Sequence, residues 1–406
     1  LLEANMNYLG LGKTLYNSSV ALLDPSGEVE IFITERFSKK KYDGAWPSLV
    51  LEKVKNNKFN RPIIENADVQ KPIVKEEAQN RVFPFYEYLT KKNLDQFCSF
   101  FNSNVQFVSH HLAHAYSALY FSPFDSGLLL VLDGAGNLAE DIEGNWQERR
   151  EHEYLSLYRF GPSGLELLRK DFLTFEPSSI LGRKLGSNIG LFFEEASSFV
   201  FGDKMASGKL MGLSSFGKPQ TITDRKIYLE SLDWKDKAWE KRDSKSWEQS
   251  PHFLEYTNIA ASVQEHYEKF LFELVAEIKK QYPGDERLVF TGGCALNCLA
   301  NYKLFQRDYF SQIFIPPNPS DIGIALGCAQ KAFFDSHGHY FTGNISPYLG
   351  PNCSLFEDRE VLELFSSYKL TRPEHLEDFT AQKIQEHKVI AWFQGRSEIG
   401  PRALGN

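Results

Sequence analysis

Apolar residues in the first 35 positions fall into three short runs separated by turn residues. The runs NYLGLG, SSVALLD and VEIFITE are rich in aliphatic residues, and glycine-rich or polar turns lie between them. Such runs are typical of short strands joined by tight turns. The chain therefore begins with three predicted strands, and a lysine-rich loop, ERFSKKKYDGAWP, follows them.

Strand and helix patterns then alternate. The run GLLLVLDGAGN is almost continuously apolar, which is typical of a strand buried on both faces. Before this run, PIVKEEAQNRVFPFYEYLTKKN predicts a helix, VQFVS a strand and HLAHAYSALYF a second helix. After it, EYLSLYRF and LELLRKDFL predict a hairpin. We interpret the charged segment 224–249 as a solvated helical excursion.

The second half continues the alternation. SVQEHYEKFLFELVAEIKKQY predicts a long amphipathic helix that ends at Pro283. RLVFTGG, ALNCLANYKLF, QIFIPPNPSD and IGIALGCAQKAFF then predict strand, loop and helix twice over. A last unit from about Leu355 contains a predicted helix and the strand VIAWF. The pattern predicts an α/β fold, and 406 residues exceed what one core normally accommodates, so two or more domains are expected.

Composition narrows the class of protein. A net charge of −8 and a pI of about 5.8 argue against a basic nucleic-acid-binding surface. Five scattered cysteines suggest reduced thiols and a cytoplasmic location, and no apolar run reaches the ~18 residues that a membrane span needs. We expect Met6 to be the natural start, and a native chain that continues past Asn406, because the sequence stops within a Gly/Arg-rich stretch.

Three of the ten histidines lie within the stretch SHHLAHAYSALYF. His110 and His114 are four residues apart, so a helix places both rings on one face, where they can share a metal ion. Ser109 can cap that helix, and His111 points elsewhere. Taken alone, the spacing is a modest signal for a metal, and two structural histidines are the favoured alternative.

Two acidic residues strengthen the metal hypothesis. Asp133 ends the buried strand and Asp321 opens a helix, although an N-cap role would also explain Asp321. Two imidazoles and two carboxylates form a plausible ligand shell for Fe, Mn or Mg.

Several glycine-rich and basic stretches could bind an anion. Gly292 and Gly293 lie between a strand and a helix, where backbone N–H groups and the helix dipole favour a phosphate. The loop SGKLMGLSSFGKP, the turn QGRSEIGPRALG and the basic loop are further candidates, with an ordinary surface turn or a solvated loop as the alternative. The cofactor-binding candidates in these three stretches are Lys39, Lys209, Gly212, Arg396 and Arg402.

These motifs, in their order along the chain, resemble the NodU/CmcH-type O-carbamoyltransferase family. The blocks that carry the resemblance are NYLGLGKTLYNSSVALL, ERFSKKKYDGAWP, HHLAHAYSA, LLVLDGAG, GKLMGLSSFGKP, FTGGCALN, PNPSDIGIALG and FQGRSEIGPRALGN. The resemblance implies an actin/chaperone-ATPase/sugar-kinase-like (ASKHA) domain with two lobes over residues 1–350. It also implies that residues 355–406 begin a YrdC-like domain.

The same resemblance implies roles for individual residues. His110, His114, Asp133 and Asp321 would hold a divalent metal, Fe²⁺ first, with Mn²⁺ or Mg²⁺ as alternatives. Gly292, Gly293 and Asn297 would contact the nucleotide, and Arg396 and Arg402 would belong to a site that forms carbamoyl-adenylate. His111 and Asp133 are our catalytic candidates, His111 for proton transfer and Asp133 through the metal.

The implied reaction uses ATP and carbamoyl phosphate to make carbamoyl-adenylate and then carbamoylates a hydroxyl of a small natural product, as in antibiotic biosynthesis, or of a glycan. Where the family has a His-Asp-Ser-like triplet, this chain has Tyr16, Asn17 and Ser18, which puts activation of the acceptor in doubt. An ASKHA-fold small-molecule kinase, tRNA threonylcarbamoyl transfer and a non-catalytic nucleotide-binding regulator are the alternatives. A homodimer is possible, and no nucleic acid or membrane partner is expected.

Overall fold

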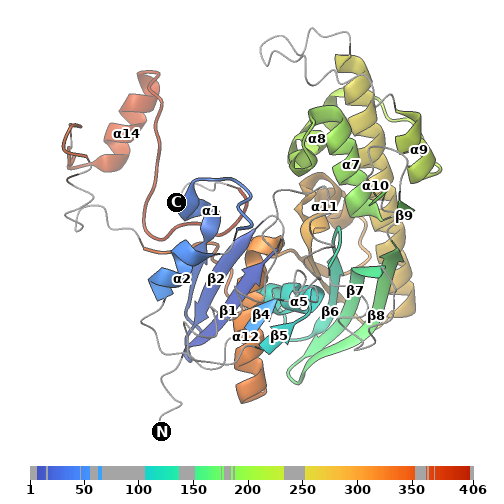
Figure 1. Cartoon of the computed structure of the whole chain (residues 1–406), viewed down its shortest axis with the longest axis horizontal. Helices are drawn as coiled ribbons and strands as arrows, with labels where there is room; N and C mark the ends of the chain where they lie inside the picture. The colour runs from blue at the N-terminus through green and yellow to red at the C-terminus, as the bar shows by residue number, and fades with distance from the viewer. Residues whose placement is uncertain are drawn as a thin grey trace, which may run out of the picture.

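The protein consists of two α/β lobes that lie side by side (Figure 1). The computed structural model describes residues 7–14, 17–45, 47–54, 63–65, 106–136, 151–174, 176–177, 184–185, 188–232, 252–352, 363, 365–369 and 371–402. The helix expected over PIVKEEAQNRVFPFYEYLTKKN lies outside these residues, as do Tyr16 and most of the charged segment, of which α9 (Arg225–Ser231) is described.

The first lobe contains a mixed sheet of five strands in the order β3-β2-β1-β4-β5. The strands are β1 (Tyr8–Lys13), β2 (Ser18–Leu23), β3 (Val29–Ile33), β4 (Ile63–Glu65) and β5 (Gln106–Val108). β1, β2 and β3 form an antiparallel meander, whereas β4 pairs parallel with β1, and β5 parallel with β4. The three strands predicted at the start of the chain are confirmed.

The second lobe repeats this topology. Its sheet runs β12-β11-β6-β7-β8, with β6 (Gly127–Leu132), β7 (Glu151–Gly161), β8 (Gly164–Thr174), β11 (Arg287–Thr291) and β12 (Gln312–Phe314). β6, β7 and β8 form the meander, and β11 and β12 add on in parallel beyond β6. Two lobes with the same strand order and directions confirm the predicted ASKHA-like α/β fold. A two-stranded pair, β9 (Glu176–Pro177) with β10 (Lys184–Leu185), extends this lobe.

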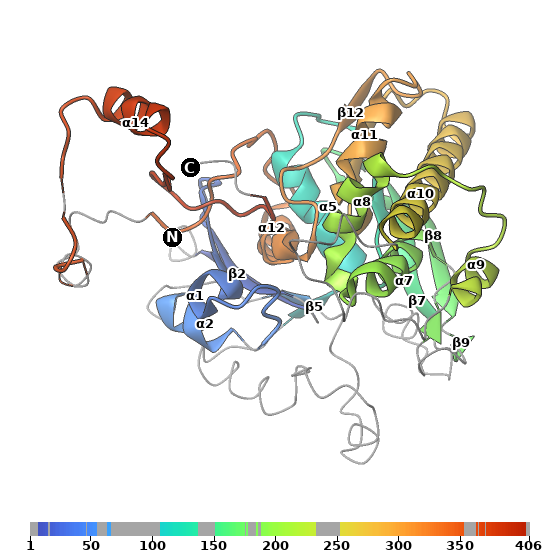
Figure 2. The same ribbon diagram turned by 90° about the horizontal axis from the view of Figure 1, so that it is seen from above.

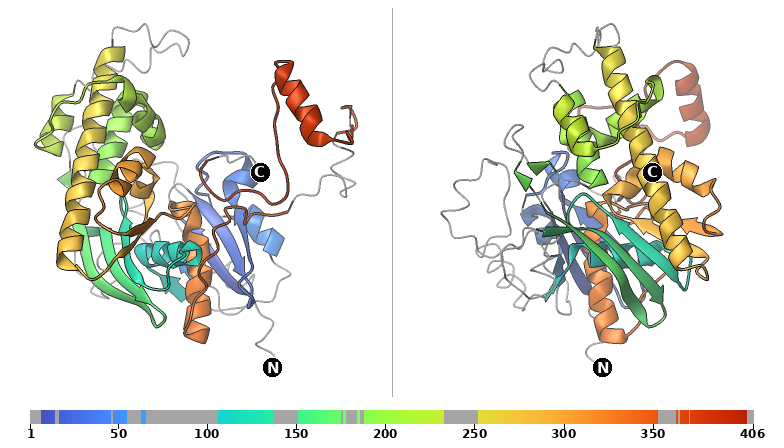
Figure 3. Two further views of the ribbon diagram at one scale, coloured as in Figure 1. Left: turned by 180° about the vertical axis from the view of Figure 1, so that it is seen from behind. Right: turned by 90° about the vertical axis from the view of Figure 1, so that its right-hand side faces the viewer.

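Helices fill the space between the two sheets and cover their outer faces (Figures 2 and 3). α12 (Ile324–His337) packs on the first sheet, and α5 (His110–Phe121) packs on the second. The two helices touch through their backbones at Gly327, where an added Cβ would lie 1.8 Å from the Ala113 carbonyl oxygen. The outer helices are α1 (Thr34–Ser38), α2 (Ser48–Val54), α7 (Ile189–Phe201), α10 (Phe253–Gln281) and α11 (Cys298–Phe305).

The stretch SGKLMGLSSFGKP is helical, which corrects the expectation of a glycine loop. It forms α8 (Ser207–Leu213) and a short 3₁₀ turn, Ser214–Phe216. Leu210 and Leu213 lie three residues apart and are buried in the core of the second lobe, so their packing favours a helix despite two glycines.

The C-terminal segment differs from the expectation in one respect. α14 (Leu376–Gln385) is the expected helix, but it buries no side chain and stands apart from the lobes (Figures 1 and 3). The predicted strand VIAWF is not a strand, because no described segment pairs with it, and Val389 is 99% exposed. Within the described residues, no helix combines the length and the apolar character that crossing a bilayer requires.

Candidate metal centre

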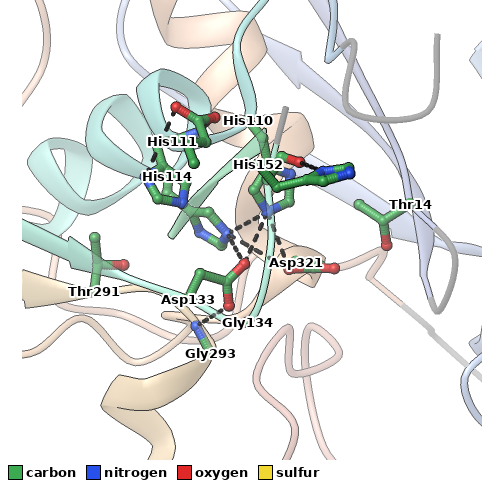
Figure 4. A network of polar contacts seen from close by, with 12 residues as sticks. Thr14, His110, His111, His114, Asp133, Gly134, His152, Thr291, Gly293 and Asp321 are labelled. Carbon is green, nitrogen blue, oxygen red and sulfur yellow. Dashed lines mark hydrogen bonds and ion pairs between the residues drawn. The ribbon is translucent and has the colours of Figure 1, made fainter. Parts of the chain in front are cut away.

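Four side chains that the sequence singles out converge in the structure. His110 and His114 lie one turn apart on α5, Asp133 follows the end of β6, and Asp321 begins a 3₁₀ turn, Asp321–Gly323, just before α12. One ligand atom from each lies within 4.8 Å of the others. Figure 4 shows both imidazole rings and both carboxylates facing one another, and we refer to these residues as the His–Asp cluster.

The spacing of the ligand atoms suits a single cation. The Nε2 atom of His110 lies 3.0 Å from Asp133 Oδ2 and 3.7 Å from Asp321 Oδ1. The Nε2 atom of His114 lies 3.5 Å from Asp321 Oδ1 and 3.2 Å from His110 Nε2. Ligands about 2.1 Å from a metal stand roughly 3.0–3.4 Å apart, so these contacts resemble the edges of a coordination shell.

The donor chemistry also fits a divalent cation. Two Nε2 atoms directed at each other can hydrogen-bond only if one carries a proton, whereas a cation satisfies both lone pairs. His110 and His114 are 1% exposed, so water does not offer an alternative partner. Burial alone would raise the pKa of the Asp133 carboxyl, but the hydrogen bond to His110 and the charge on the nearby imidazoles hold it well below its ordinary value.

Each oxygen of Asp133 has its own partner. Oδ2 faces the two histidines, and Oδ1 accepts a hydrogen bond of 2.9 Å from the Gly293 amide. The amide of Gly292 donates to the Pro319 carbonyl at 3.0 Å, two residues before Asp321. The glycine loop therefore ties together the two segments that carry the carboxylates.

Only glycine suits this loop. Gly292 has φ +93°, and an added Cβ would lie 2.3 Å from the Leu132 carbonyl oxygen, while a Cβ on Gly293 would lie 2.6 Å from Asp133 Oδ1. The N–H groups of both glycines already donate hydrogen bonds within the protein, to the Pro319 carbonyl and to Asp133 Oδ1. The contact of a nucleotide with Gly292 and Gly293 stays a prediction.

Asn297 lies behind the glycine loop. Its Oδ1 accepts from the Ala300 amide and caps α11, and its side-chain amide exchanges hydrogen bonds with Gln264 at 2.8 and 3.0 Å. These bonds give Asn297 a clear structural role, and its predicted contact with the nucleotide is not tested by them.

His111 points away from the His–Asp cluster, as its helical position predicts. Its Nδ1 lies 2.8 Å from Ser156 Oγ, and its Nε2 is buried without a hydrogen-bond partner among the described residues. Burial lowers the pKa of the His111 ring to about 3, so the ring is neutral at physiological pH. Proton transfer by His111 stays a prediction, and the ring is completely buried in this conformation.

The predicted anion-binding groups lie in different surroundings. The Arg402 guanidinium lies against Gly208, since a Cβ there would meet Nη2 at 3.0 Å, and Lys209 is the next residue of α8. Lys39 is exposed at the end of α1, and a Cβ on Gly212 would meet nothing within 4 Å. The structure thus brings Arg402 beside the Lys209 segment, although the two are almost 200 residues apart.

Arg396 is bonded to the first lobe. Its Nε donates to the Gly350 carbonyl at 2.9 Å, and Nη2 donates to the carbonyls of Leu349 and Val29 at 2.9 and 2.5 Å. Ile399, three residues further on, is buried in the core of that lobe. In the structure, Arg396 fastens the C-terminal segment to the first lobe, and its place in an adenylate-forming site stays a prediction.

One carboxyl beside the loop that follows Asp133 was not predicted from the sequence. Glu194 of α7 lies next to Gly134, where an added Cβ would be 3.4 Å from Oε1. Burial raises the pKa of the Glu194 carboxyl to about 8, and the charge of Asp133 adds to this effect while Lys204 opposes it. The run FFEEASSFVF gives no sign of this, because α7 carries two adjacent glutamates and only the fold shows which one faces Asp133.

The raised pKa of Glu194 predicts that the stability of the chain depends on pH and that Glu194→Gln removes this dependence. In the cation-free folded chain this carboxyl holds its proton up to about pH 8, whereas the unfolded chain releases it near 4.5. The folded state therefore loses stability as the pH rises through this window. We expect Glu194→Gln to unfold at the same temperature as the unmodified chain near pH 4 and at a higher temperature at pH 8.5. Equal midpoints at pH 8.5 would show an ordinary, ionised carboxylate.

Comparison with known proteins identifies the family. Residues 53–330 match the family described as carbamoyltransferase N-terminus, and residues 381–406 match the one described as carbamoyltransferase C-terminus. The first match alone covers more than half of the chain. The chain belongs to the carbamoyltransferase family. This confirms the resemblance that the ordered motifs indicated.

Curated relatives of this carbamoyltransferase chain include two named proteins. Nodulation protein NolNO of Sinorhizobium fredii is 29% identical over 333 residues, which cover 75% of this chain and 43% of that protein. The 3'-hydroxymethylcephem-O-carbamoyltransferase of Amycolatopsis lactamdurans is 30% identical over 324 residues, covering 76% and 55%. The chain thus spans about half the length of these relatives. Among solved structures, HypF of T. kodakarensis matches with a TM-score of 0.47 and 13% identity, over 82% of this chain and 48% of that one.

The segment that departs from the family triplet lies after β1. Asn17 is buried, and its Oδ1 has no hydrogen-bond partner among the described residues. An amide at this position cannot accept a proton as a carboxylate can. The effect of this departure on the activation of an acceptor stays a prediction.

Proposed function

We propose that the protein is an O-carbamoyltransferase that transfers a carbamoyl group from carbamoyl-adenylate to a hydroxyl group. In this reaction the acceptor oxygen attacks the carbamoyl carbon, the bond from that carbon to the phosphate oxygen breaks, and AMP leaves. A neighbouring histidine or carboxylate takes the hydroxyl proton. Unactivated carbamate is a poor donor, and attachment to AMP supplies the leaving group. The relative named as acting on a hydroxymethylcephem supports a small-molecule hydroxyl acceptor.

The convergence of the His–Asp cluster beside the glycine loop carries this proposal. Two imidazoles and two carboxylates from three separate segments meet within 4.8 Å, and Gly293 bonds directly to one of the carboxylates. His110 and His114 would hold a divalent cation through Nε2, Asp133 through Oδ2 and Asp321 through Oδ1. Such a cation, when bound, polarises a carbamoyl oxygen and neutralises phosphate charge.

The protein's own groups supply the remaining features of the site. The Gly293 amide holds Asp133 Oδ1, so only Oδ2 is directed at the cation. Gly292 and Gly293 lie next to the cluster, and we place the nucleotide beside them as part of this proposal. A donor bound there would have its phosphate close to the two carboxylates, whose charge the cation must offset.

Formation of carbamoyl-adenylate from carbamoyl phosphate and ATP belongs to the same proposal. Residues 381–406 match the family described as carbamoyltransferase C-terminus, and Arg402 lies within that match. We assign this first step to the C-terminal unit and the transfer step to residues 1–350. Iron is the cation we propose, since the ligand set of two imidazoles and two carboxylates also suits Fe²⁺.

Mass spectrometry can test the two steps separately. The purified chain would be incubated with Fe²⁺ or Mn²⁺ and a panel of hydroxyl acceptors, in one series with carbamoyl phosphate and ATP and in another with carbamoyl-adenylate supplied directly. We expect a carbamoylated acceptor (a gain of 43 Da by simple composition, roughly one CHNO unit) and AMP in the second series. Release of ADP with a phosphorylated acceptor would instead indicate a kinase of this fold. Binding of nucleotide without turnover of any acceptor would indicate a regulator.

A further inference from the structure

A buried carboxylate outside the His–Asp cluster connects the segments that form it. Glu153 of β7 has a completely buried side chain. Its Oε1 accepts a hydrogen bond of 3.1 Å from the His111 amide, and its Oε2 forms an ion pair with Lys170 of β8. Its main-chain carbonyl accepts from the Gly136 amide at 2.8 Å. One residue thus contacts the start of α5, the neighbouring strand and the loop that follows Asp133.

Glu153 takes the place of a helix cap for α5. Ser109 occupies the N-cap position as predicted, but its hydroxyl makes no capping hydrogen bond. The first turn of a helix has unpaired amide donors and a partial positive charge, so a carboxylate there satisfies a donor and is favourably placed in the dipole. The bond from the His111 amide to Glu153 therefore fixes the end of α5 that carries His110.

The same short stretch of β7 also holds the Asp133 segment. The Asp133 amide donates to the Tyr154 carbonyl at 3.0 Å, beside the bond from Gly136 to Glu153. At Gly136 there is no free space, since a Cβ would lie 2.8 Å from the Glu153 side chain and 3.0 Å from the His111 ring. Displacement of Glu153 would therefore reach both α5 and the Asp133 loop.

A β-bulge turns Glu153 toward α5. Between Glu153 and Leu155 the register of β7 against β8 shifts by one residue, which leaves Tyr154 as the extra residue. As a result Glu153 faces the same side as Ser156, whose Oγ bonds the His111 ring, while Leu155 faces the core on the other side. Two side chains of β7 thus bond to His111 in the first turn of α5. Glu153 bonds to its main-chain amide, and Ser156 bonds to its ring.

We propose that Glu153, held by Lys170, is a positioning residue of the His–Asp cluster. It fixes α5 and the Asp133 loop in the relative placement that brings their ligand atoms together. The part of this inference that concerns cation binding depends on the proposed function, whereas the mechanical coupling of the two segments does not. Neither Glu153 nor Lys170 contributes a ligand atom to the cluster.

Cation affinity and amide exchange would test the role of Glu153. The affinity of the full chain for Mn²⁺ would be measured by calorimetry, and Co²⁺ spectra would report the ligand geometry. We expect Glu153→Ala to weaken Mn²⁺ binding about 10- to 100-fold and to alter the Co²⁺ bands. Glu153→Gln keeps an oxygen for the His111 amide and should recover most of the affinity.

A stability-matched control separates positioning from general destabilisation. Leu271 is buried in the core of the second lobe, so Leu271→Ala lowers the unfolding temperature without touching the cluster. We expect this variant to keep its Mn²⁺ affinity within about twofold, as expected for a distant site. Equal losses of affinity in Leu271→Ala and Glu153→Ala, or wild-type affinity in Glu153→Ala, would overturn the proposal.

Amide hydrogen exchange tests whether Glu153 couples α5 to the Asp133 loop, even if the chain binds no cation. In the cation-free chain, Glu153→Ala should speed amide exchange in residues 110–114 and 133–136 together, and Leu271→Ala should not do so selectively. Unchanged exchange in either segment would refute the positioning role. Failure of carbamoyl transfer with intact Mn²⁺ binding would count against the proposed function alone.

Discussion

His114→Ala is expected to weaken divalent cation binding by more than about a hundredfold and to remove the cation-dependent carbamoyl transfer that we propose. The substitution deletes one of two neutral nitrogen donors and leaves two carboxylates with a single imidazole. It also leaves a buried space at a side chain that is 1% exposed, which a water molecule would fill with weaker donor power. Calorimetry with Mn²⁺ and turnover with carbamoyl-adenylate measure the two effects.

Two further variants make this result specific. His337 lies near the end of α12 and bonds to Tyr8, so His337→Ala removes an imidazole without touching the cluster and should retain cation affinity. Asp133→Asn keeps the shape of the side chain and an oxygen for the Gly293 amide but removes the charge that faces both histidines. It should fold and bind the cation poorly. Tight Mn²⁺ binding by both His114→Ala and Asp133→Asn would show that the cluster is not the cation site.

The His–Asp cluster could be predicted because local rules place its members. A spacing of four residues puts His110 and His114 on one helix face whatever surrounds them. Asp133 follows a run of apolar residues that is typical of a central strand, and such strands end where α/β proteins build their sites. The ordered motifs supplied Asp321. No long-range geometry was needed for these four.

Residues whose role depends on an irregularity could not be predicted. Simple alternation along EHEYLSLYRF puts Glu153 on the face of Leu155 and opposite Ser156, whereas the bulge at Tyr154 reverses this. The sequence alone does not show where a strand gains an extra residue, so it gives no reason to connect Glu153 with α5. Glu194 could not be predicted either, because only the fold places it beside Gly134 in the loop after Asp133.

Glycine content misled the interpretation of α8 for a related reason. Gly208 and Gly212 lower helix propensity, yet the burial of Leu210 and Leu213 against the second lobe outweighs it. The strand prediction at VIAWF was wrong, because strand propensity is not sufficient where no described segment supplies the partner that a strand requires. Arg396 shows the converse case, since a guanidinium predicted to bind an anion bonds three main-chain carbonyls.

Gly327→Ala and Gly212→Ala are expected to change stability in opposite directions. Both replace a glycine within a helix, and helix propensity alone favours alanine by about 0.5–1 kcal/mol. At Gly212 a Cβ meets nothing within 4 Å, so Gly212→Ala should gain part of that amount. At Gly327 the Cβ would lie 1.8 Å from the Ala113 carbonyl oxygen, and neither α5 nor α12 can yield without disturbing both sheets.

We therefore expect Gly327→Ala to lower the free energy of unfolding by about 3 kcal/mol or more, as forced overpacking does. Thermal unfolding of both variants measures the difference directly. A stable Gly327→Ala protein would mean that α5 and α12 are not in backbone contact. Since His110 and His114 are carried by α5 and Asp321 stands just before α12, that result would also remove the packing that brings the cluster together.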